Sequence, residues 1–184
     1  MIAFKGFNKD LTCRGLKFNI FNITDQANCR QNGFHCAENP LDCLSYYPDW
    51  EESVYYKVLA SGDINEDGND SKISCTELTL LEKLDVEKFV YESLKYMFIH
   101  PFREWSNKVC ADRAEVKEGF MIVRGKKPLA KGKIGVTIGF AQEEENTKKI
   151  MLVNQFKVDG KDVLPDVWYD ILGNPVSEES EGDL

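Results

Sequence analysis

Residues 53–61 read SVYYKVLAS, residues 72–81 read KISCTELTLL, and the turn-rich stretch GDINEDGND lies between them. Both flanking segments are rich in β-branched and aromatic residues, which favour strands. Glycine, asparagine and aspartate dominate the connection, and these residues favour turns. The three segments together predict a β-hairpin, from which the rest of the fold can be built outward.

The main helix is predicted directly after this hairpin. Apolar residues between Asp85 and Ile99 recur at the spacing of one helical face, which we expect to pack on a sheet. Asp85 suits the cap of the helix N-terminus, and Pro101 is expected to end the helix. The apolar positions are Val86, Phe89, Val90, Leu94, Met97 and Phe98.

Two strands and a short helix are predicted before the hairpin. Residues 2–7 are rich in apolar side chains, and residues 16–23 alternate in a way that indicates a strand. Asn39 is a favoured N-cap and Pro40 suits the first helical position, so a short helix begins there. The strand face expected to be buried carries Leu16, Phe18 and Ile20.

The region after residue 110 is predicted to be β-rich. Its strand-like segments are 119–123, 134–142, 150–158 and 167–172. The sequence therefore predicts an α+β fold: a mostly antiparallel sheet with one short and one main helix, followed by a β-rich C-terminal section. We place an N-terminal α+β domain at 1–110, a β-rich module at 111–176 and an acidic disordered tail at 177–184.

The composition is that of an ordinary globular chain of 184 residues with a net charge of -8. This charge disfavours non-specific binding to nucleic acid and to anionic membranes. No apolar run approaches the roughly 20 residues of a membrane helix, and the first ten residues do not resemble a signal peptide. We therefore expect a cytoplasmic protein with reduced thiols and no membrane association.

The N-terminal region holds the candidate metal ligands. Thiolates and imidazole bind tetrahedral zinc, but these cysteines form no close C-x2-C pair. Buried, reduced, structural cysteines without a metal are the favoured interpretation. Cys36 next to His35 has the residue types of a nucleophile and its base, but neighbours on a strand point to opposite faces. The candidate ligands are Cys13, Cys29, Cys36 and Cys43, with His35 among them.

Two further motifs are interpreted as solvated loops rather than as binding sites. Residues 63–68 (DINEDG) imitate the start of an EF-hand loop, but Ser74 stands where calcium needs a bidentate glutamate. A solvated hairpin loop is therefore favoured. A basic run without interleaved aromatic residues is expected to be a solvated loop rather than a nucleic-acid site. That run consists of Arg124, Lys126, Lys127, Lys131 and Lys133.

Several segments resemble a domain family of unknown function found in bacteria and their phages. They are FKGFNKDLTCRG (4–15), GFHCAENPLD (33–42), the pair Tyr46-Tyr47, ASGD (60–63) with DSKISC (70–75), AKGKIG (130–135) and KVDGKDVLPDVWYDI (157–171). Longer relatives place short repeats that look like β-solenoid turns between the two parts. About one such turn fits in residues 120–134 here. The resemblance implies no activity and supplies no catalytic residues.

The sequence favours one function and leaves one alternative. The absence of a convergent acid, base and nucleophile pattern favours a non-catalytic binding or interaction protein, with an unknown protein or small-molecule partner and no cofactor. The alternative is a group-transfer enzyme with an ADP-ribosyltransferase-like site. In it Arg14 would hold a pyrophosphate, Tyr47 would stack on nicotinamide and Glu77 would stabilise an oxocarbenium-like state, with His35 nearby. A plainer role for Arg14 is pairing with an acidic residue.

Overall fold

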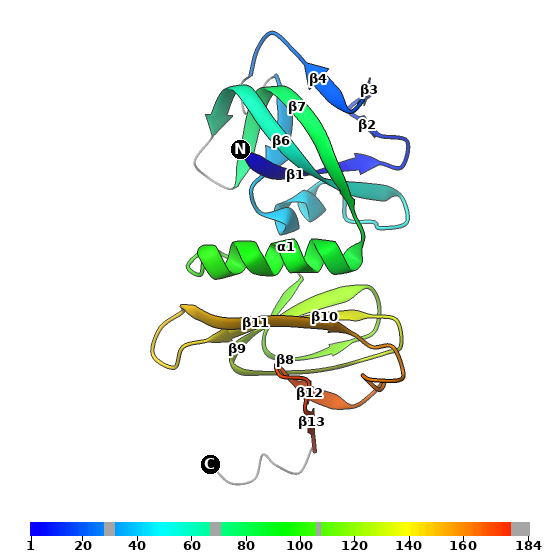
Figure 1. Ribbon diagram of the computed structural model, residues 1–184, viewed down its shortest axis with the longest axis vertical. Helices are drawn as coiled ribbons and strands as arrows, with labels where there is room; N and C mark the ends of the chain where they lie inside the picture. The colour runs from blue at the N-terminus through cyan, green and yellow to red at the C-terminus, as the bar shows by residue number, and fades with distance from the viewer. Residues whose placement is uncertain (28–31, 67–70, 106–107, 178–184) are drawn as a thin grey trace. The chain divides into compact units, whose positions relative to one another are not determined.

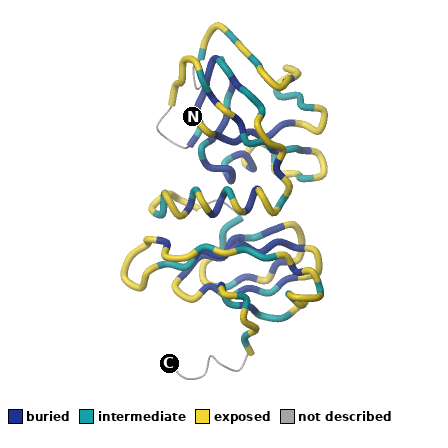
Figure 2. Tube along the Cα trace, viewed as in Figure 1, coloured by how far each residue is buried: buried dark blue, intermediate teal, exposed yellow. Residues whose placement is uncertain are grey.

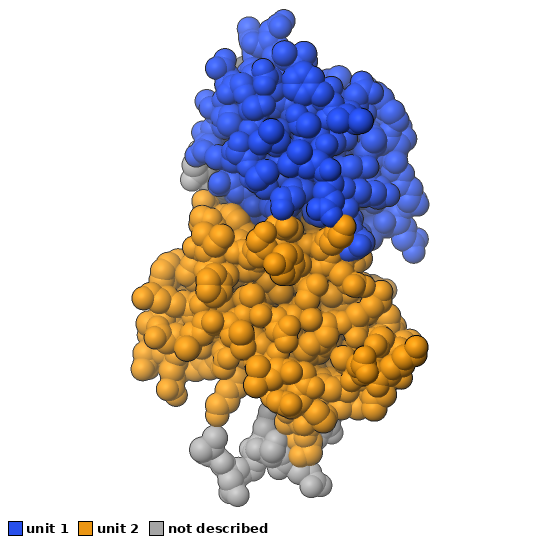
Figure 3. Space-filling model, viewed as in Figure 1, with its two compact units in different colours: residues 1–85 blue, residues 86–184 orange. Residues whose placement is uncertain are grey.

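The computed structural model describes residues 1–27, 32–66, 71–105 and 108–177. The chain divides into two compact units, Met1–Asp85 and Val86–Leu184, which Figure 3 shows in different colours. The predicted domain boundary after residue 110 stays a prediction. Of the predicted acidic tail, residues 178–184 lie outside the described part of the chain. No helix in the described residues is both long enough and apolar enough to cross a membrane.

The first unit is built around four strands that close on themselves. In the sheet, β1 pairs with β5 and β6, and β7 pairs with the same two strands, all antiparallel. The predicted hairpin is therefore confirmed as β6 and β7 (Figure 1). The elements of this unit are β1 (Ile2–Asn8), β2 (Thr12–Cys13), β3 (Leu16–Lys17), β4 (Phe21–Ile23), β5 (Phe34–Ala37), η1 (Pro40–Ser45), β6 (Ser53–Glu66) and β7 (Lys72–Leu84).

The short helix η1 begins where the sequence predicts. The Asn39 side chain accepts a hydrogen bond from the Leu41 backbone N–H at 3.2 Å, which satisfies one of the free donors at the helix start. The prediction of one strand over residues 16–23 is wrong in part, because β3 pairs with β2 in a separate two-stranded sheet, whereas β4 pairs with β7. Phe18 is buried as expected, whereas Leu16 and Ile20 are 58% and 76% exposed.

The second unit begins with the main helix, α1 (Val86–Ile99). Its predicted apolar face is confirmed for Phe89, Val90, Leu94 and Met97, which are buried, but not for Phe98, which is 47% exposed. The helix packs on β10 and β11. Figure 2 shows buried and exposed residues alternating along the helix. The strands of this unit are β8 (Val109–Val116), β9 (Phe120–Gly132), β10 (Thr137–Glu143), β11 (Ile150–Lys157), β12 (Trp168–Asp170) and β13 (Pro175–Val176).

Strand β9 pairs in parallel with both β8 and β10, whereas the other pairings of the described strands are antiparallel. The parallel partners are close in sequence: Val109 lies opposite Ile122, and Phe120 lies opposite Thr137. Parallel neighbours normally need a crossover element between them. Here the chain instead makes one coil per strand, in the manner of a β-solenoid turn.

The basic run lies in β9 and its end, so its interpretation as a solvated loop is wrong. Arg124 is only 1% exposed, because its side chain enters the interior of the unit. Lys133 pairs with Asp166 at 2.8 Å on the surface. For the EF-hand-like stretch, Asp63 lies in β6 and strands flank the loop as expected, while residues 67–70 lie outside the described residues.

Candidate functional site

A cavity of about 370 Å³ opens in the first unit, beside the junction of β1 and β5. The ladder between these two strands contains a single residue pair, Phe4 with Ala37. Beyond this pair the backbones of β1 and β5 do not bond to each other, and side chains line the space between them. The lining comes from β1, the β2–β3 hairpin, β5, η1 and the start of β7.

Lys5 lies at this cavity and is only 5% exposed. Side chains alternate along a strand, so Lys5 shares the inward face of β1 with Ala3 and Phe7. Its ammonium donates to the His35 carbonyl at 2.6 Å and lies 3.6 Å from the Cys13 sulfur. Among the described residues, no carboxylate lies within ion-pair distance of Lys5. The fold therefore buries an ammonium that these residues do not neutralise.

Arg14 is placed at the cavity by a strained turn. Arg14 and Gly15 have φ values of 49° and 81°, and two positive values in succession are typical of a type I′ hairpin turn. Glycine or asparagine usually occupies the first of these positions, because other side chains are strained there. The β2–β3 hairpin thus carries a long cation at a position that favours a smaller residue.

Tyr47 forms the opposite wall, with its ring against β1. Burial, together with a hydrogen bond to the Cys13 thiol, raises the pKa of the Tyr47 hydroxyl well above its usual value, although the Arg14 charge acts in the other direction. Gly6 permits this close packing: a Cβ at residue 6 would lie 2.6 Å from Tyr47 Cδ2. The hydroxyl therefore stays protonated at neutral pH, with its hydrogen directed at the Cys13 sulfur.

Replacing Gly6 with alanine is expected to lower the free energy of unfolding of the first unit by about 1–3 kcal/mol, since the added methyl displaces the Tyr47 ring. Denaturant titration, followed by tyrosine and tryptophan fluorescence, measures the loss. Lys9→Ala, at an exposed position just beyond β1, is the control and is expected to stay within about 0.5 kcal/mol. An unchanged Gly6→Ala midpoint would contradict the packing of Tyr47 on β1.

A second group of polar residues lines the cavity near η1. The Asp42 carboxylate accepts hydrogen bonds from Asn39 Nδ2 at 3.0 Å and from the Ser71 hydroxyl. Lys72 lies opposite Ala37 on β5, and its ammonium is 5.5 Å from the centre of the Tyr46 ring. Counting Lys5, Arg14 and Lys72 against Asp42, the lining carries more positive than negative charge in a chain whose net charge is -8.

Two cysteines of this region, Cys36 and Cys43, are held as thiols. Burial raises the pKa of Cys43 to about 12, and a hydrogen bond with Cys75, together with burial, raises the pKa of Cys36. A protonated thiol is a poor metal ligand and a poor nucleophile. Cys29 lies outside the described residues. Within the described ranges, no three His, Cys, Asp or Glu side chains are grouped as metal ligands would be.

The cavity brings together three of the four residues named for group transfer. Arg14, His35 and Tyr47 all line it, but Glu77 does not; its carboxylate accepts a hydrogen bond from the Ser61 hydroxyl at 2.9 Å. Sequence reasoning missed Lys5, Asp42 and Lys72 as lining residues. Lys5 had a usable signal, because it lies between two apolar residues on one face of a predicted strand.

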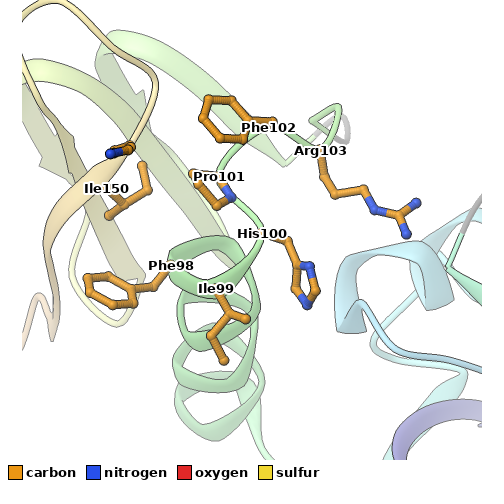
Figure 4. Close-up of a pocket in the computed structure, with 8 residues that line it drawn as sticks. Phe98, Ile99, His100, Pro101, Phe102, Arg103 and Ile150 are labelled. Atoms are coloured by element: carbon orange, nitrogen blue, oxygen red, sulfur yellow. The ribbon is translucent and has the colours of Figure 1, made fainter.

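The second unit has a hollow of about 590 Å³ at the C-terminal end of α1. Figure 4 shows Phe98 and Ile150 on one side of it, and His100 pointing away from them. Phe98 and Phe102 are 47% and 70% exposed, and none of the polar side chains in the lining is buried. The cavity of the first unit is therefore the better candidate site, since only there does a buried polar group face the space.

Comparison with known proteins gives one match. Residues 1–92 match a protein-family model described as a domain of unknown function, DUF7666. No curated protein and no solved structure matches the chain. All the residues that line the N-terminal cavity fall within the matched region, and the resemblance seen in the N-terminal segments is confirmed. The match covers half of the chain's 184 residues. The chain therefore belongs to the DUF7666 family, a domain of unknown function.

Proposed function

We propose that the first unit is a non-catalytic binding module whose cavity takes a small molecule carrying a phosphate or carboxylate group. The observation that carries this proposal is the burial of Lys5 without a neutralising carboxylate among the described residues. Burying an unpaired charge costs free energy, and a bound anion offsets that cost. In this proposal the protein acts in the cytoplasm of a bacterium, or as a phage-related protein there.

The other groups of the cavity support an anion rather than a cation. The Arg14 guanidinium offers a planar set of donors that suits phosphate and carboxylate oxygens. The Tyr47 hydroxyl stays protonated and neutral, so it adds no competing negative charge to the cavity. Asp42 is the one carboxylate in the described lining, and two side chains already hold it. An anion near Lys5 and Arg14 therefore meets donors rather than a competing charge.

The experiment is a titration of the full chain with inorganic phosphate, followed by amide NMR. We expect saturable shifts in β1, in the β2–β3 hairpin and in η1. Lys5→Met keeps the length and the apolar stem of the side chain but removes the charge. It is expected to weaken binding by about tenfold or more, since charge-assisted hydrogen bonds contribute roughly 1.5–3 kcal/mol.

Two further variants make the result decisive. Arg14→Asn removes the second cation but suits the positive φ, so the turn is retained and binding weakens. Lys17→Met removes a charge from the same hairpin at a position that does not line the cavity, and binding stays within twofold of the parent. Equal phosphate affinity in Lys5→Met, Arg14→Asn and the parent protein would overturn the proposal, as would the absence of any shift with phosphate and with acetate.

The group-transfer alternative is tested in parallel. It needs Glu77 beside Arg14 and His35, and Glu77 does not line the cavity. We therefore expect that incubation of the protein with NAD and candidate acceptor proteins releases no nicotinamide. Release that Glu77→Gln abolishes would replace the binding role with an enzymatic one.

A further inference from the structure

We infer that the ligand of the N-terminal cavity is a nucleotide, in which a planar aromatic base accompanies the phosphate. This inference rests on the proposed anion binding and names the class of ligand. The inference is argued from three lining residues that have no role in the binding of a simple anion: Tyr46, Lys72 and Asp42.

Tyr46 has the position and rigidity of a stacking platform. Its side chain is 58% exposed although it lines the cavity, so a large part of its surface is open to a ligand. The backbone is fixed, because the N–H groups of Tyr46 and Tyr47 both donate to the Cys43 carbonyl, at 3.2 and 3.0 Å. Because this backbone is ordered before binding, only the side-chain torsions of Tyr46 lose freedom when a base stacks on its ring.

The cavity has two chemically different ends. Lys5 reaches His35 on β5, whereas Lys72 lies opposite Ala37, two residues further along the same strand. Two residues of a strand span about 7 Å. Lys5 and Arg14 belong to one end, because the Lys5 ammonium lies 3.6 Å from the Cys13 sulfur and Arg14 follows Cys13 in the chain. Lys72 and Tyr46 belong to the other end. A nucleotide has the same order: a phosphate, a ribose, and then a base.

Asp42 lies at the Lys72 end of the cavity, because it accepts a hydrogen bond from Ser71, the residue before Lys72. Its carboxylate accepts one hydrogen bond from Asn39 and one from Ser71, which leaves acceptor capacity for a ribose hydroxyl or a base amino group. The volume of about 370 Å³ lies in the range of small-molecule sites, roughly 300–1,000 Å³, and is large for a phosphate ion alone. Phosphate, ribose and base thus each have a partner in the described lining.

The test compares four probes on the full chain by calorimetry: inorganic phosphate, ribose 5-phosphate, adenosine 5′-monophosphate and uridine 5′-monophosphate. Stacking on an aromatic side chain contributes roughly 1–3 kcal/mol per base, so at least one nucleotide is expected to bind about tenfold more tightly than ribose 5-phosphate. Tyr46→Leu is expected to remove this advantage and to leave the affinity for ribose 5-phosphate unchanged.

The chain offers a matched control for Tyr46. Tyr91 on α1 is 54% exposed, and the Lys95 ammonium lies 5.5 Å from its ring, the same distance as in the pair of Lys72 and Tyr46. Tyr91→Leu is expected to leave every affinity unchanged, which separates stacking in the cavity from a general effect of losing an exposed tyrosine.

The outcomes for the two proposals are distinguishable. Equal affinities for ribose 5-phosphate and for both nucleotides would overturn the nucleotide inference while anion binding stands. An unchanged nucleotide affinity in Tyr46→Leu would overturn it as well. Failure of all four probes to bind would remove the proposed function itself, and the nucleotide inference with it.

Discussion

Replacing Arg124 with methionine is expected to lower the free energy of unfolding of the second unit by about 3–5 kcal/mol, the usual cost of removing one partner of a buried ion pair. Arg124 is 1% exposed, and its Nε lies 2.6 Å from a carboxylate oxygen of Glu143. The substitution leaves that carboxylate, which is 16% exposed, without its cation. The penalty comes mainly from the orphaned charge rather than from the lost attraction.

The same guanidinium also joins separate parts of the unit. It donates to the carbonyls of Pro101 and Lys148, and it lies 5.0 Å from the centre of the Trp105 ring. These contacts hold the segment after α1 and the segment before β11 against β9. Methionine fills much of the volume but donates to neither carbonyl, so two acceptors lose their partner.

Chemical denaturation followed by tryptophan fluorescence measures the Arg124→Met effect. Adding Glu143→Leu to Arg124→Met is expected to recover part of the loss, because the unpaired carboxylate is removed. Lys126→Met, at an exposed position of the same strand, is the control and stays within about 0.5 kcal/mol. A loss below 1 kcal/mol for Arg124→Met would show that the pair is solvated and contributes little.

Replacing Phe89 with alanine is expected to cost about 3–5 kcal/mol, as for other large aromatic residues in a core. Phe89 is fully buried on α1, and its ring centre lies 5.8 Å from that of Phe120 on β9. The cavity left by the lost ring lies between the helix and the sheet of the second unit. Tyr91→Ala on the exposed side of the same helix is the control, with an expected loss within about 0.5 kcal/mol.

Hydrogen exchange shows which unit the Phe89 substitution weakens. Amides of β9 and β10 are expected to lose protection, whereas those of β6 and β7 retain theirs, because α1 packs on the strands of the second unit. Loss of protection in β6 and β7 alone would instead assign the helix to an N-terminal domain that extends to residue 110.

Local sequence signals predicted the short helix of the first unit and the main helix of the second. Asn39-Pro40 marks the start of η1 through capping, and the spacing of Phe89, Leu94 and Met97 marks the buried face of α1. These features depend on residues close together in the chain. The burial of Leu16 and Ile20 was predicted wrongly, because alternation assumes a continuous strand and cannot detect the break between β3 and β4.

Features that depend on pairing between residues far apart in the chain could not be predicted from the sequence. Strand β8 carries Asp112, Arg113 and Glu115, and its irregular pairing with β9 after Ala111 hides the alternation of a strand. The cavity arises where β1 and β5 stop pairing, and no local pattern records this. Arg14, His35 and Tyr47 were candidates by residue type alone, while their meeting in one cavity required the closed sheet.

The coiling of β8, β9 and β10 has a consequence for the length of the protein. Strand β9 bonds in parallel to the coil before it and to the coil after it, so insertion of a whole coil between β8 and β10 preserves the parallel pairing on both sides. The second unit can therefore be lengthened by one coil at a time, while the strands at its two ends keep their pairing. The cavity takes no lining residue after Lys72, so such growth leaves its chemistry intact and changes only the size of the structure attached to it.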